Sequence, residues 1–161
     1  MNVMAIQTES ELLDIADQLR EELVARGNEI DKNRYLPQDL ADKLASLGFY
    51  RLVAPEPLGG LGVSPEFFCR ICESLAKGNG STAWCVFIGA TSQYLFGALP
   101  TSQLKKMLAN PNVITSGVFA DSVTAEEKKK GWAARLSDQR SLALGMPMQE
   151  CRVDIWRYPR N

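Results

Sequence analysis

Histidine is absent from this 161-residue chain, and neither sign of charge is in excess. Without an imidazole, Ser-His-Asp and Cys-His nucleophile systems and His-ligated metal sites are excluded. Eighteen basic and nineteen acidic side chains give a net charge of -1, so there is no basic surplus to neutralise a phosphate backbone. Nucleic acid is therefore not an expected partner, and any chemistry is expected to depend on a bound cofactor or on carboxylates and hydroxyls.

Long apolar runs are also lacking. The longest, Ala83–Leu99, is interrupted by three polar residues and is shorter than the ~20 apolar residues that a bilayer span requires. Met1–Gln7 has neither the basic start nor the apolar stretch of a secretory signal. Four cysteines without such a signal are typical of reduced thiols. We expect a cytoplasmic protein without a membrane partner.

A succession of helical patterns occupies most of the chain. Apolar residues at three- and four-residue spacing form stripes in three segments. Ala83–Leu99 is apolar nearly all round, which is typical of a helix in the middle of a bundle, and a short helix follows from Thr101. The chain is therefore predicted to be mainly α, with five helices. The three stripes are Leu12, Ile15, Ala16, Leu19 and Leu23; Leu40, Ala41, Leu44 and Leu47; and Phe67, Phe68, Ile71, Cys72, Leu75 and Ala76.

Local signals indicate where these helices begin and end. Thr8 and Glu11 have the spacing of a capping box ahead of the first stripe, which fades near Gly27. Gly48 follows the second stripe and is predicted to be its left-handed stop. Phe49–Val63 is rich in proline and glycine, so a turn-rich connection is expected there.

Residues typical of β-strands appear only after the helices. Val113–Phe119 is β-branched and aromatic and is predicted to be a strand. Trp132–Leu136 is a second candidate strand, and Glu126–Lys130 is interpreted as a charged turn between the two. The expected order is thus a helical bundle followed by the beginning of a sheet.

Three local motifs have simple structural interpretations. Cys69 and Cys72 lie on one helix face without a second pair, so inward packing is favoured over a zinc site. The glycines of Gly59–Gly62 lack the preceding strand of a phosphate loop and predict a tight turn with positive φ. The aromatic residues of the fourth helix are predicted to be core, but a buried tryptophan or tyrosine needs a hydrogen-bond partner and could edge a ligand pocket. These aromatic residues are Trp84, Phe87, Tyr94 and Phe96.

Several strings, taken in order, resemble the acyl-CoA dehydrogenase superfamily. The helix from Leu36-Pro37 to Phe49 and the string Pro55–Gly60 are similar to the opening of that superfamily. Gly80–Trp84 and Ser116–Ala120 look like its branch of flavin-dependent monooxygenases that hydroxylate phenols and related aromatic compounds. The resemblance covers roughly residues 8–120.

The resemblance implies a three-part fold: a helical N-terminal domain, a central β domain and a C-terminal four-helix bundle. A flavin, FAD or FMN, would lie between the β domain and the bundle, with a second subunit contributing to the site. A partner flavin reductase would supply reduced flavin, and the substrate would be a small aromatic or acyl compound. Ala83–Leu99 would wall the substrate pocket. The implied site residues are Trp84, Gln93 and Tyr94 for the substrate, and Phe119, Ala120 and Ser122 for the flavin.

The chain also departs from the family. In members of the family, a proline and a glycine usually follow the Val-Phe-Ala string. Here that string is followed by Asp121, Ser122 and Val123. Members of the family are more than twice as long. Residues 138–161 do not continue the pattern, but a one-base shift of the reading frame permits a string that resembles the family's next segment. We therefore interpret the chain as frameshifted or truncated, with a helical domain at 8–111, the start of a β domain at 112–137 and a non-family tail at 138–161.

The sequence leaves three functions open. The favoured one is the N-terminal domain of a flavin-dependent oxidoreductase, most similar to a two-component aromatic monooxygenase. The alternatives are a fragment of an acyl-CoA dehydrogenase that acts on CH–CH groups, and a stand-alone helical interaction module or non-functional fragment. Because one domain does not close a site built from three, we expect the isolated chain to bind flavin weakly and to be inactive. No residue is assigned a catalytic or metal-binding role.

Overall fold

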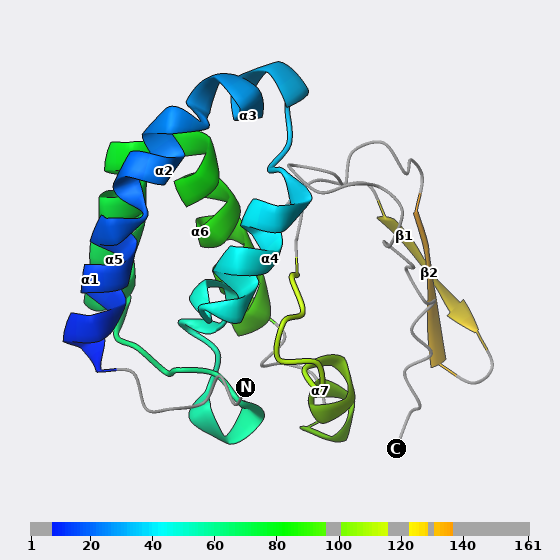
Figure 1. The fold of residues 1–161 in the computed structure, drawn as a ribbon. Helices are drawn as coiled ribbons and strands as arrows, with labels where there is room; N and C mark the ends of the chain where they lie inside the picture. The colour runs from blue at the N-terminus through cyan, green and yellow to red at the C-terminus, as the bar shows by residue number, and fades with distance from the viewer. Residues whose placement is uncertain (1–7, 96–100, 116–122, 129–130, 137–161) are drawn as a thin grey trace.

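Helices make up most of the described chain, and a two-stranded hairpin follows them (Figure 1). The computed structural model describes residues 8–95, 101–115, 123–128 and 131–136. Its helices are α1 (Glu9–Gln18), α2 (Arg20–Ala25), α3 (Gly27–Asn33), α4 (Gln38–Ser46), α5 (Pro65–Gly78), α6 (Gly80–Leu95) and α7 (Thr101–Met107), with short 3₁₀ turns η1 (Phe49–Arg51) and η2 (Glu56–Leu58). Its strands are β1 (Val123–Lys128) and β2 (Gly131–Leu136).

The first predicted helix is three short helices in succession. The capping box is confirmed: the Thr8 N–H donates to Glu11 Oε2 at 2.8 Å, and the Glu11 N–H donates to Thr8 Oγ1 at 3.3 Å. The prediction that the apolar stripe fades near Gly27 is wrong, because a further helix, α3, begins at that residue. The apolar stripe continues, since Ile30 lies seven residues after Leu23 and both side chains are buried.

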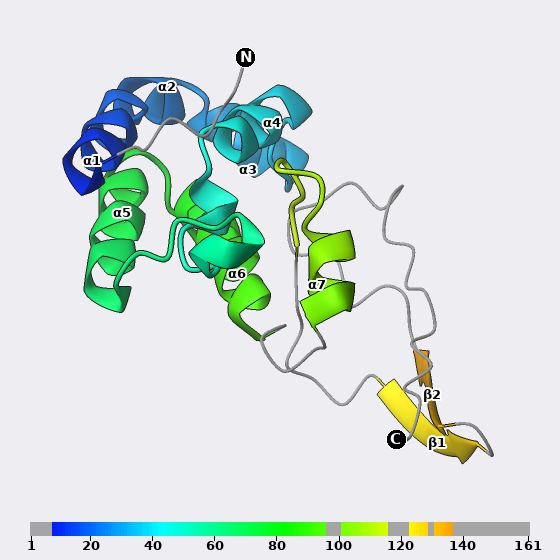
Figure 2. The same cartoon turned by 90° about the horizontal axis from the view of Figure 1, so that it is seen from below.

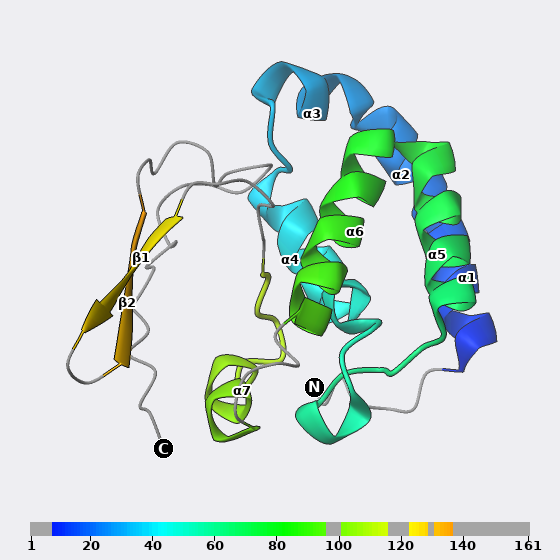
Figure 3. The same ribbon diagram turned by 180° about the vertical axis from the view of Figure 1, so that it is seen from behind.

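Helices α5 and α6 form the centre of the bundle. Figure 2 shows α5 running beside α1, and Figures 1 and 3 show α6 between α5 and the segment of α4 and η1. The start of α5 is capped as its sequence suggests, because the Phe67 N–H donates to Ser64 Oγ at 3.1 Å. The fully buried side chains of this core include Leu12, Leu23, Leu40, Leu44, Phe49, Leu52, Ile71, Leu75 and Val86.

Glycines shape the connection between α4 and α5. Gly48 has φ 82° and Gly59 has φ 80°, so the left-handed stop and the tight turn predicted from the sequence are confirmed. Gly60 is required for a different reason. A Cβ atom placed there would lie 1.9 Å from the carbonyl oxygen of Ala54, so only glycine fits this close approach of two backbone segments.

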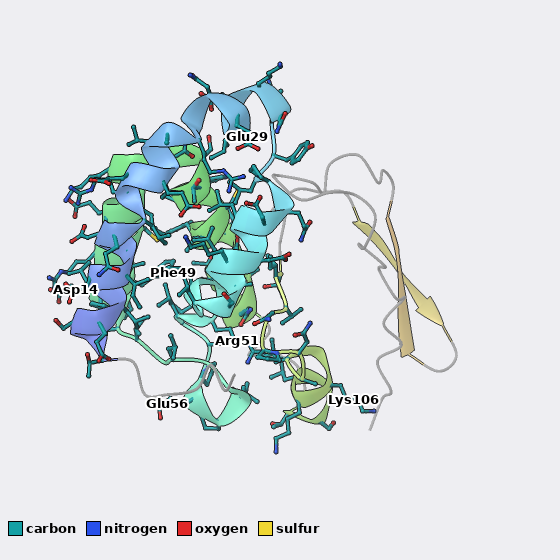
Figure 4. All side chains as sticks on the ribbon, viewed as in Figure 1. Asp14, Glu29, Phe49, Arg51, Glu56 and Lys106 are labelled. Carbon is teal, nitrogen blue, oxygen red and sulfur yellow. The ribbon has the colours of Figure 1, made fainter. Side chains whose placement is uncertain are left out.

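A buried arginine fixes this connection to the end of α7. The guanidinium of Arg51 donates to the carbonyl oxygen of Gly59 at 2.8 Å, of Leu108 at 2.5 Å and of Asn110 at 2.7 Å. Figure 4 shows Arg51 between the connection and α7. Burial lowers the pKa of Arg51 from its usual value, but an arginine remains charged at neutral pH. Its positive charge interacts favourably with the carbonyl groups of Leu108 and Asn110 at and after the end of α7.

The residues after α7 differ from two sequence predictions. Val113–Thr115, the described part of the predicted strand Val113–Phe119, is not a strand; Ile114 instead packs against the helical core. The charged turn predicted at Glu126–Lys130 is wrong for its first three residues, which belong to β1. β1 and β2 are antiparallel, in register from Val123 opposite Leu136 to Lys128 opposite Gly131. Residues 138–161, the predicted tail, lie outside the described residues.

Candidate functional site

The candidate site is built on α6, the predicted wall of a substrate pocket. The helix begins three residues before the predicted start at Ala83, because Asn79 caps it. Asn79 Oδ1 accepts from the Thr82 N–H at 2.8 Å and from Thr82 Oγ1 at 2.9 Å. Between Gly80 and Leu95 there is no charged side chain. The helix can therefore offer a ligand an apolar wall with a few neutral polar groups, and it offers no counter-charge to a flavin phosphate.

One face of α6 is fully buried. Thr82, Val86, Gly89 and Gln93 recur at helical spacing and are all buried. Gly89 lets η1 approach, since a Cβ atom at that position would lie 2.4 Å from Cδ1 of Tyr50. The Tyr50 side chain is itself buried, and burial raises the pKa of its phenol. We call these four positions the inner stripe of α6.

Gln93 is the polar residue of the inner stripe whose hydrogen-bonding capacity is unused. Its side chain is 3% exposed, and neither Oε1 nor Nε2 has a hydrogen-bond partner within the described part of the chain. The preceding hydroxyls differ: Thr91 Oγ1 donates to the Phe87 carbonyl at 2.7 Å, and Ser92 Oγ donates to the Ile88 carbonyl at 2.7 Å. A buried amide without partners costs about 1–3 kcal/mol, so Gln93 does not stabilise the fold through its polar group.

The opposite face of α6 carries an aromatic stack. Trp84 stacks on Phe87 with ring centroids 5.8 Å apart, and Phe87 stacks on Phe68 of α5 at 5.5 Å. The prediction that Trp84 is a core residue is wrong, because its side chain is 52% exposed. The apolar composition of α6 did not distinguish the exposed face from the buried one.

The structure separates two of the predicted substrate residues. Trp84 and Gln93 are nine residues apart, which is about two and a half helical turns, so they point in nearly opposite directions. Tyr94 follows Gln93 in α6, but its side chain is not among the described ones, and Phe96 lies outside the described residues. Gln93 faces the core and Trp84 faces outward.

The predicted flavin contacts Phe119, Ala120 and Ser122 lie outside the described residues. The described residue nearest to them in sequence on their N-terminal side is Thr115, whose Oγ1 donates to the Gly89 carbonyl oxygen at 3.0 Å. The segment that leads to the predicted contacts is thus attached to α6 one helical turn before Gln93.

The described cysteines differ in how far they are exposed. Cys69, Cys72 and Cys85 are free thiols, and no cluster of three metal-ligating side chains occurs among the described residues. Burial, and then the neighbouring Cys69, raise the pKa of Cys72 to about 12, and burial also raises the pKa of Cys85. Cys69 is exposed, so its predicted inward packing is wrong.

Two residues of this region were not found by sequence reasoning. Arg51 lies in a segment without periodicity, and its only signal was a lone basic residue between apolar ones. Thr115 was assigned to a strand, where its hydroxyl has no predicted partner. Both act through bonds to backbone carbonyls far along the chain, which no local pattern encodes.

In the described part of the chain, no helix has the length and apolar character needed to cross a membrane.

Comparison with known proteins identifies the family. Residues 7–110 match the acyl-CoA dehydrogenase N-terminal domain.

Two named relatives are monooxygenases. The chain is 35% identical over 122 residues to indole-3-acetate monooxygenase of Acinetobacter baumannii, covering 75% of this chain and 31% of that protein. It is 35% identical over 68 residues to the oxygenase subunit HsaA of a flavin-dependent monooxygenase of Rhodococcus jostii, covering 42% of this chain and 18% of that protein.

A solved structure shows the same fold. The HsaA monooxygenase of M. tuberculosis superposes with a TM-score of 0.74 at 22% identity, over 80% of this chain and 35% of that one. The chain thus spans about a third of the length of the indole-3-acetate monooxygenase and of this solved chain. The helical fold and the match over residues 7–110 together establish that this chain belongs to the acyl-CoA dehydrogenase N-terminal domain family.

Proposed function

We propose that the chain provides the N-terminal helical domain of the oxygenase component of a two-component, flavin-dependent monooxygenase that acts on an aromatic compound. The observation that carries the proposal is the uncharged helix α6, with one unpaired amide on its buried face, in a chain similar to indole-3-acetate monooxygenase. Such a helix suits a flat apolar substrate with few polar groups.

In this proposal, α6 excludes water from one side of the substrate and orients it. The flavin, FAD or FMN, supplies the oxygen activation when bound. Phe119, Ala120 and Ser122 are the proposed contacts to its ring, and Thr115 holds their segment against α6. Of the pocket residues, Gln93 and Tyr94 belong with the substrate. Trp84 faces outward and would reach a substrate only if the pocket extended round the helix.

The proposed partners follow from the same relatives. An oxygenase subunit of a two-component enzyme needs a reductase that delivers reduced flavin, and a second copy of the oxygenase is proposed to complete the site. We propose that the helical domain comprises residues 8–111, that residues 112–137 begin the β domain, and that residues 138–161 belong to neither. The cytoplasm, where reduced flavin is available, is the proposed location.

A second candidate is the oxidation of an acyl-CoA at a CH–CH bond, which the family match to acyl-CoA dehydrogenases favours. The two functions differ in the group that the domain must accept. An acyl-CoA brings several phosphate charges, and α6 has no basic side chain to meet them. We therefore favour the aromatic substrate.

A chimera tests this assignment. Residues 1–115 of this chain would replace the aligned segment of the indole-3-acetate monooxygenase of A. baumannii, and oxygen uptake would be measured with reduced flavin. We expect uptake that depends on indole-3-acetate, and no reduction of an electron-accepting dye with acyl-CoA compounds. A folded, flavin-binding chimera that oxidises acyl-CoA, or that ignores both substrates, would contradict the proposal. The unmodified monooxygenase is the control.

A further inference from the structure

We propose that two copies of this chain pair through the outer face of α5, with the two helices antiparallel about a two-fold axis and Trp84 of α6 near the centre of the contact. Figures 2 and 3 show α5 and α6 side by side on a face that no other described element covers. This face lies away from the inner stripe of α6, and the inference does not depend on the proposed enzyme function.

Four charged side chains form a row along the exposed face of α5. Their spacing places them within about 60° of one another around the helix axis, and all four are exposed. Their signs alternate along the row, which consists of Glu66, Arg70, Glu73 and Lys77. Among the described residues the row contains one ion pair, Lys77 with Glu73 at 3.6 Å, and these side chains are 55% and 70% exposed. The charges are therefore accessible to another molecule.

The charged row is complementary to itself when it is turned end to end. Glu66 and Lys77 lie at equal distances from the middle of α5, and so do Arg70 and Glu73. A second α5 placed antiparallel about that middle point sets Arg70 opposite the second copy's Glu73, and Glu66 opposite its Lys77. Each pair then occurs twice, as a two-fold contact requires. A parallel pair in register would instead set like charges opposite each other, which opposes association.

Small side chains lie between the charged row and α6. Cys69, Cys72 and Ala76 follow one another along this side of α5, between the row and the face from which Phe68 packs toward α6. Cys69 and Ala76 are exposed, and Cys72 is half-buried. Two helices approach more closely where the facing side chains are small, so this strip gives a second α5 room to come near.

Trp84 lies beside the middle of α5. After Asn79, α6 runs back along α5, and Phe87 of α6 stacks on Phe68 of α5 at 5.5 Å. Trp84 is about one turn nearer to the start of α6 and stacks on Phe87 at 5.8 Å. Its side chain is 52% exposed, which leaves apolar area that a partner can bury. An aromatic side chain near the centre of a contact with a polar rim is typical of residues that dominate association.

A second copy of the chain is the partner that fits this face. Every charge of the row meets its opposite in a molecule that carries the same row in the reverse direction. An anionic lipid surface or a nucleic acid would require an excess of basic side chains, and the row has two of each sign. Because the contact is small, we expect a weak, reversible dimer that is largely dissociated at roughly micromolar concentrations.

The test is sedimentation equilibrium of the 161-residue chain over a range of concentrations at low salt. We expect a monomer–dimer equilibrium for the wild type. Arg70→Glu or Glu73→Arg alone should raise the dissociation constant about ten-fold, because each sets like charges opposite each other at two symmetric positions. A mixture of the two variants should associate nearly as well as the wild type, since every opposed pair in the mixed dimer again has opposite signs. The double variant Arg70→Glu/Glu73→Arg should do the same.

Matched variants keep the result specific to this face. Lys32→Glu changes the net charge as Arg70→Glu does, at an exposed position on α3, and should keep the wild-type dissociation constant. Glu66→Lys and Lys77→Glu repeat the design at the outer pair, and they decide the question if an inner variant fails to fold. Circular dichroism of each variant checks that its helices are retained.

Replacement of the exposed tryptophan tests the centre of the contact. Trp84→Ser should raise the dissociation constant about ten-fold or more, because it removes the apolar side chain placed there. A wild-type chain that stays monomeric at its highest soluble concentration would overturn the inference. A dimer that is unaffected by Trp84→Ser or by both inner charge reversals would also overturn it, as would a mixture of Arg70→Glu and Glu73→Arg that associates no better than either variant alone.

Discussion

Arg51 is a single residue whose hydrogen bonds hold the end of α7 against the connection between α4 and α5. Its guanidinium donates to three carbonyl oxygens from two distant parts of the chain. One side chain thus supplies hydrogen-bond donors to carbonyl groups in both parts. The planar guanidinium can serve several acceptors at once, which a lysine ammonium does less well in a fixed geometry. Arg51 is thus part of the fold and has no assigned role in the site.

Replacing Arg51 by methionine should destabilise the chain. The variant keeps the apolar stem but leaves the carbonyl groups of Gly59 and Leu108 without their donor, and that of Asn110 with only the Val113 N–H. We expect a loss of about 3 kcal/mol in the free energy of unfolding. Urea unfolding measures it. Arg70→Met, at an exposed position on α5, is the control and should stay within about 0.5 kcal/mol of the wild type. Equal stabilities of the two variants would show that the three bonds contribute nothing.

Asp17 makes a pH-dependent link between α1 and α5. Ser74 Oγ donates to Asp17 Oδ1 at 2.6 Å, and Arg20 Nη2 donates to the same oxygen at 2.6 Å. The hydrogen bond from Ser74, supported by Arg20, lowers the pKa of Asp17 below 3.8. A carboxyl group with a lowered pKa in the folded state contributes stability above about pH 4, and that contribution is lost as the pH falls through its folded pKa.

Asp17→Asn should therefore remove part of the acid sensitivity of the chain. We expect wild type and variant to differ most in unfolding free energy above about pH 4 and to converge as the pH falls through the lowered pKa of Asp17. Urea unfolding at a series of pH values measures this difference. Asp14→Asn, at an exposed position of the same helix, is the control and should follow the wild-type slope. A constant offset between Asp17→Asn and wild type at every pH would refute the linkage.

At the scale of an element, α6 depends on a glycine where it meets η1. Gly89→Ala would place a Cβ atom 2.4 Å from the ring of Tyr50, and we expect a loss of about 1–3 kcal/mol as the two elements separate. Gly80→Ala is the matched change in the same helix, and nothing lies within 4 Å of its Cβ position. It should be neutral or stabilising by about 0.5–1 kcal/mol. Thermal unfolding of the two variants compares them, and the opposite order would contradict this packing.

The positions of the helices were predicted from the sequence better than the faces that they bury. Capping residues and glycine stops are local, so Thr8 and Gly48 have the roles expected of them. The same local reasoning does not reveal which face of α6 is covered, because Trp84 is as apolar as its buried neighbours. Val113–Thr115 has strand composition, but Ile114 packs against the helical core, because β-propensity is weak and the packing context overrides it.

The family and the helix that carries the candidate site were predicted, but the roles of the site residues stay predictions. The resemblance correctly indicated the family, and the apolar composition of Ala83–Leu99 correctly indicated the helix α6. Neither composition nor spacing distinguishes Gln93, which is buried, from an ordinary polar interruption in a helix. The unpaired state of its amide is a property of packing in three dimensions. The predicted role of Gln93 in the pocket stays a prediction, as do those of Phe119, Ala120 and Ser122.

For the whole molecule, the described core lies within the first 115 residues. Its buried members run from Leu12 to Leu108, and Ile114 packs against them. Deleting residues 138–161 should therefore change the free energy of unfolding of the helical part by less than about 1 kcal/mol. Thermal unfolding of the full chain and of the version ending at Ser137 measures this. A larger loss would show that the tail contributes to the native core.

The central proposal is that this helical domain forms one wall of an aromatic hydroxylation site that also needs residues after position 115. The most direct measurement is oxygen labelling with the chimera that carries residues 1–115. Under ¹⁸O₂, with reduced flavin and indole-3-acetate, mass spectrometry of the product should find one ¹⁸O atom incorporated into the aromatic compound. A chimera that binds flavin and consumes oxygen, but releases only peroxide and leaves indole-3-acetate unlabelled, would contradict the claim.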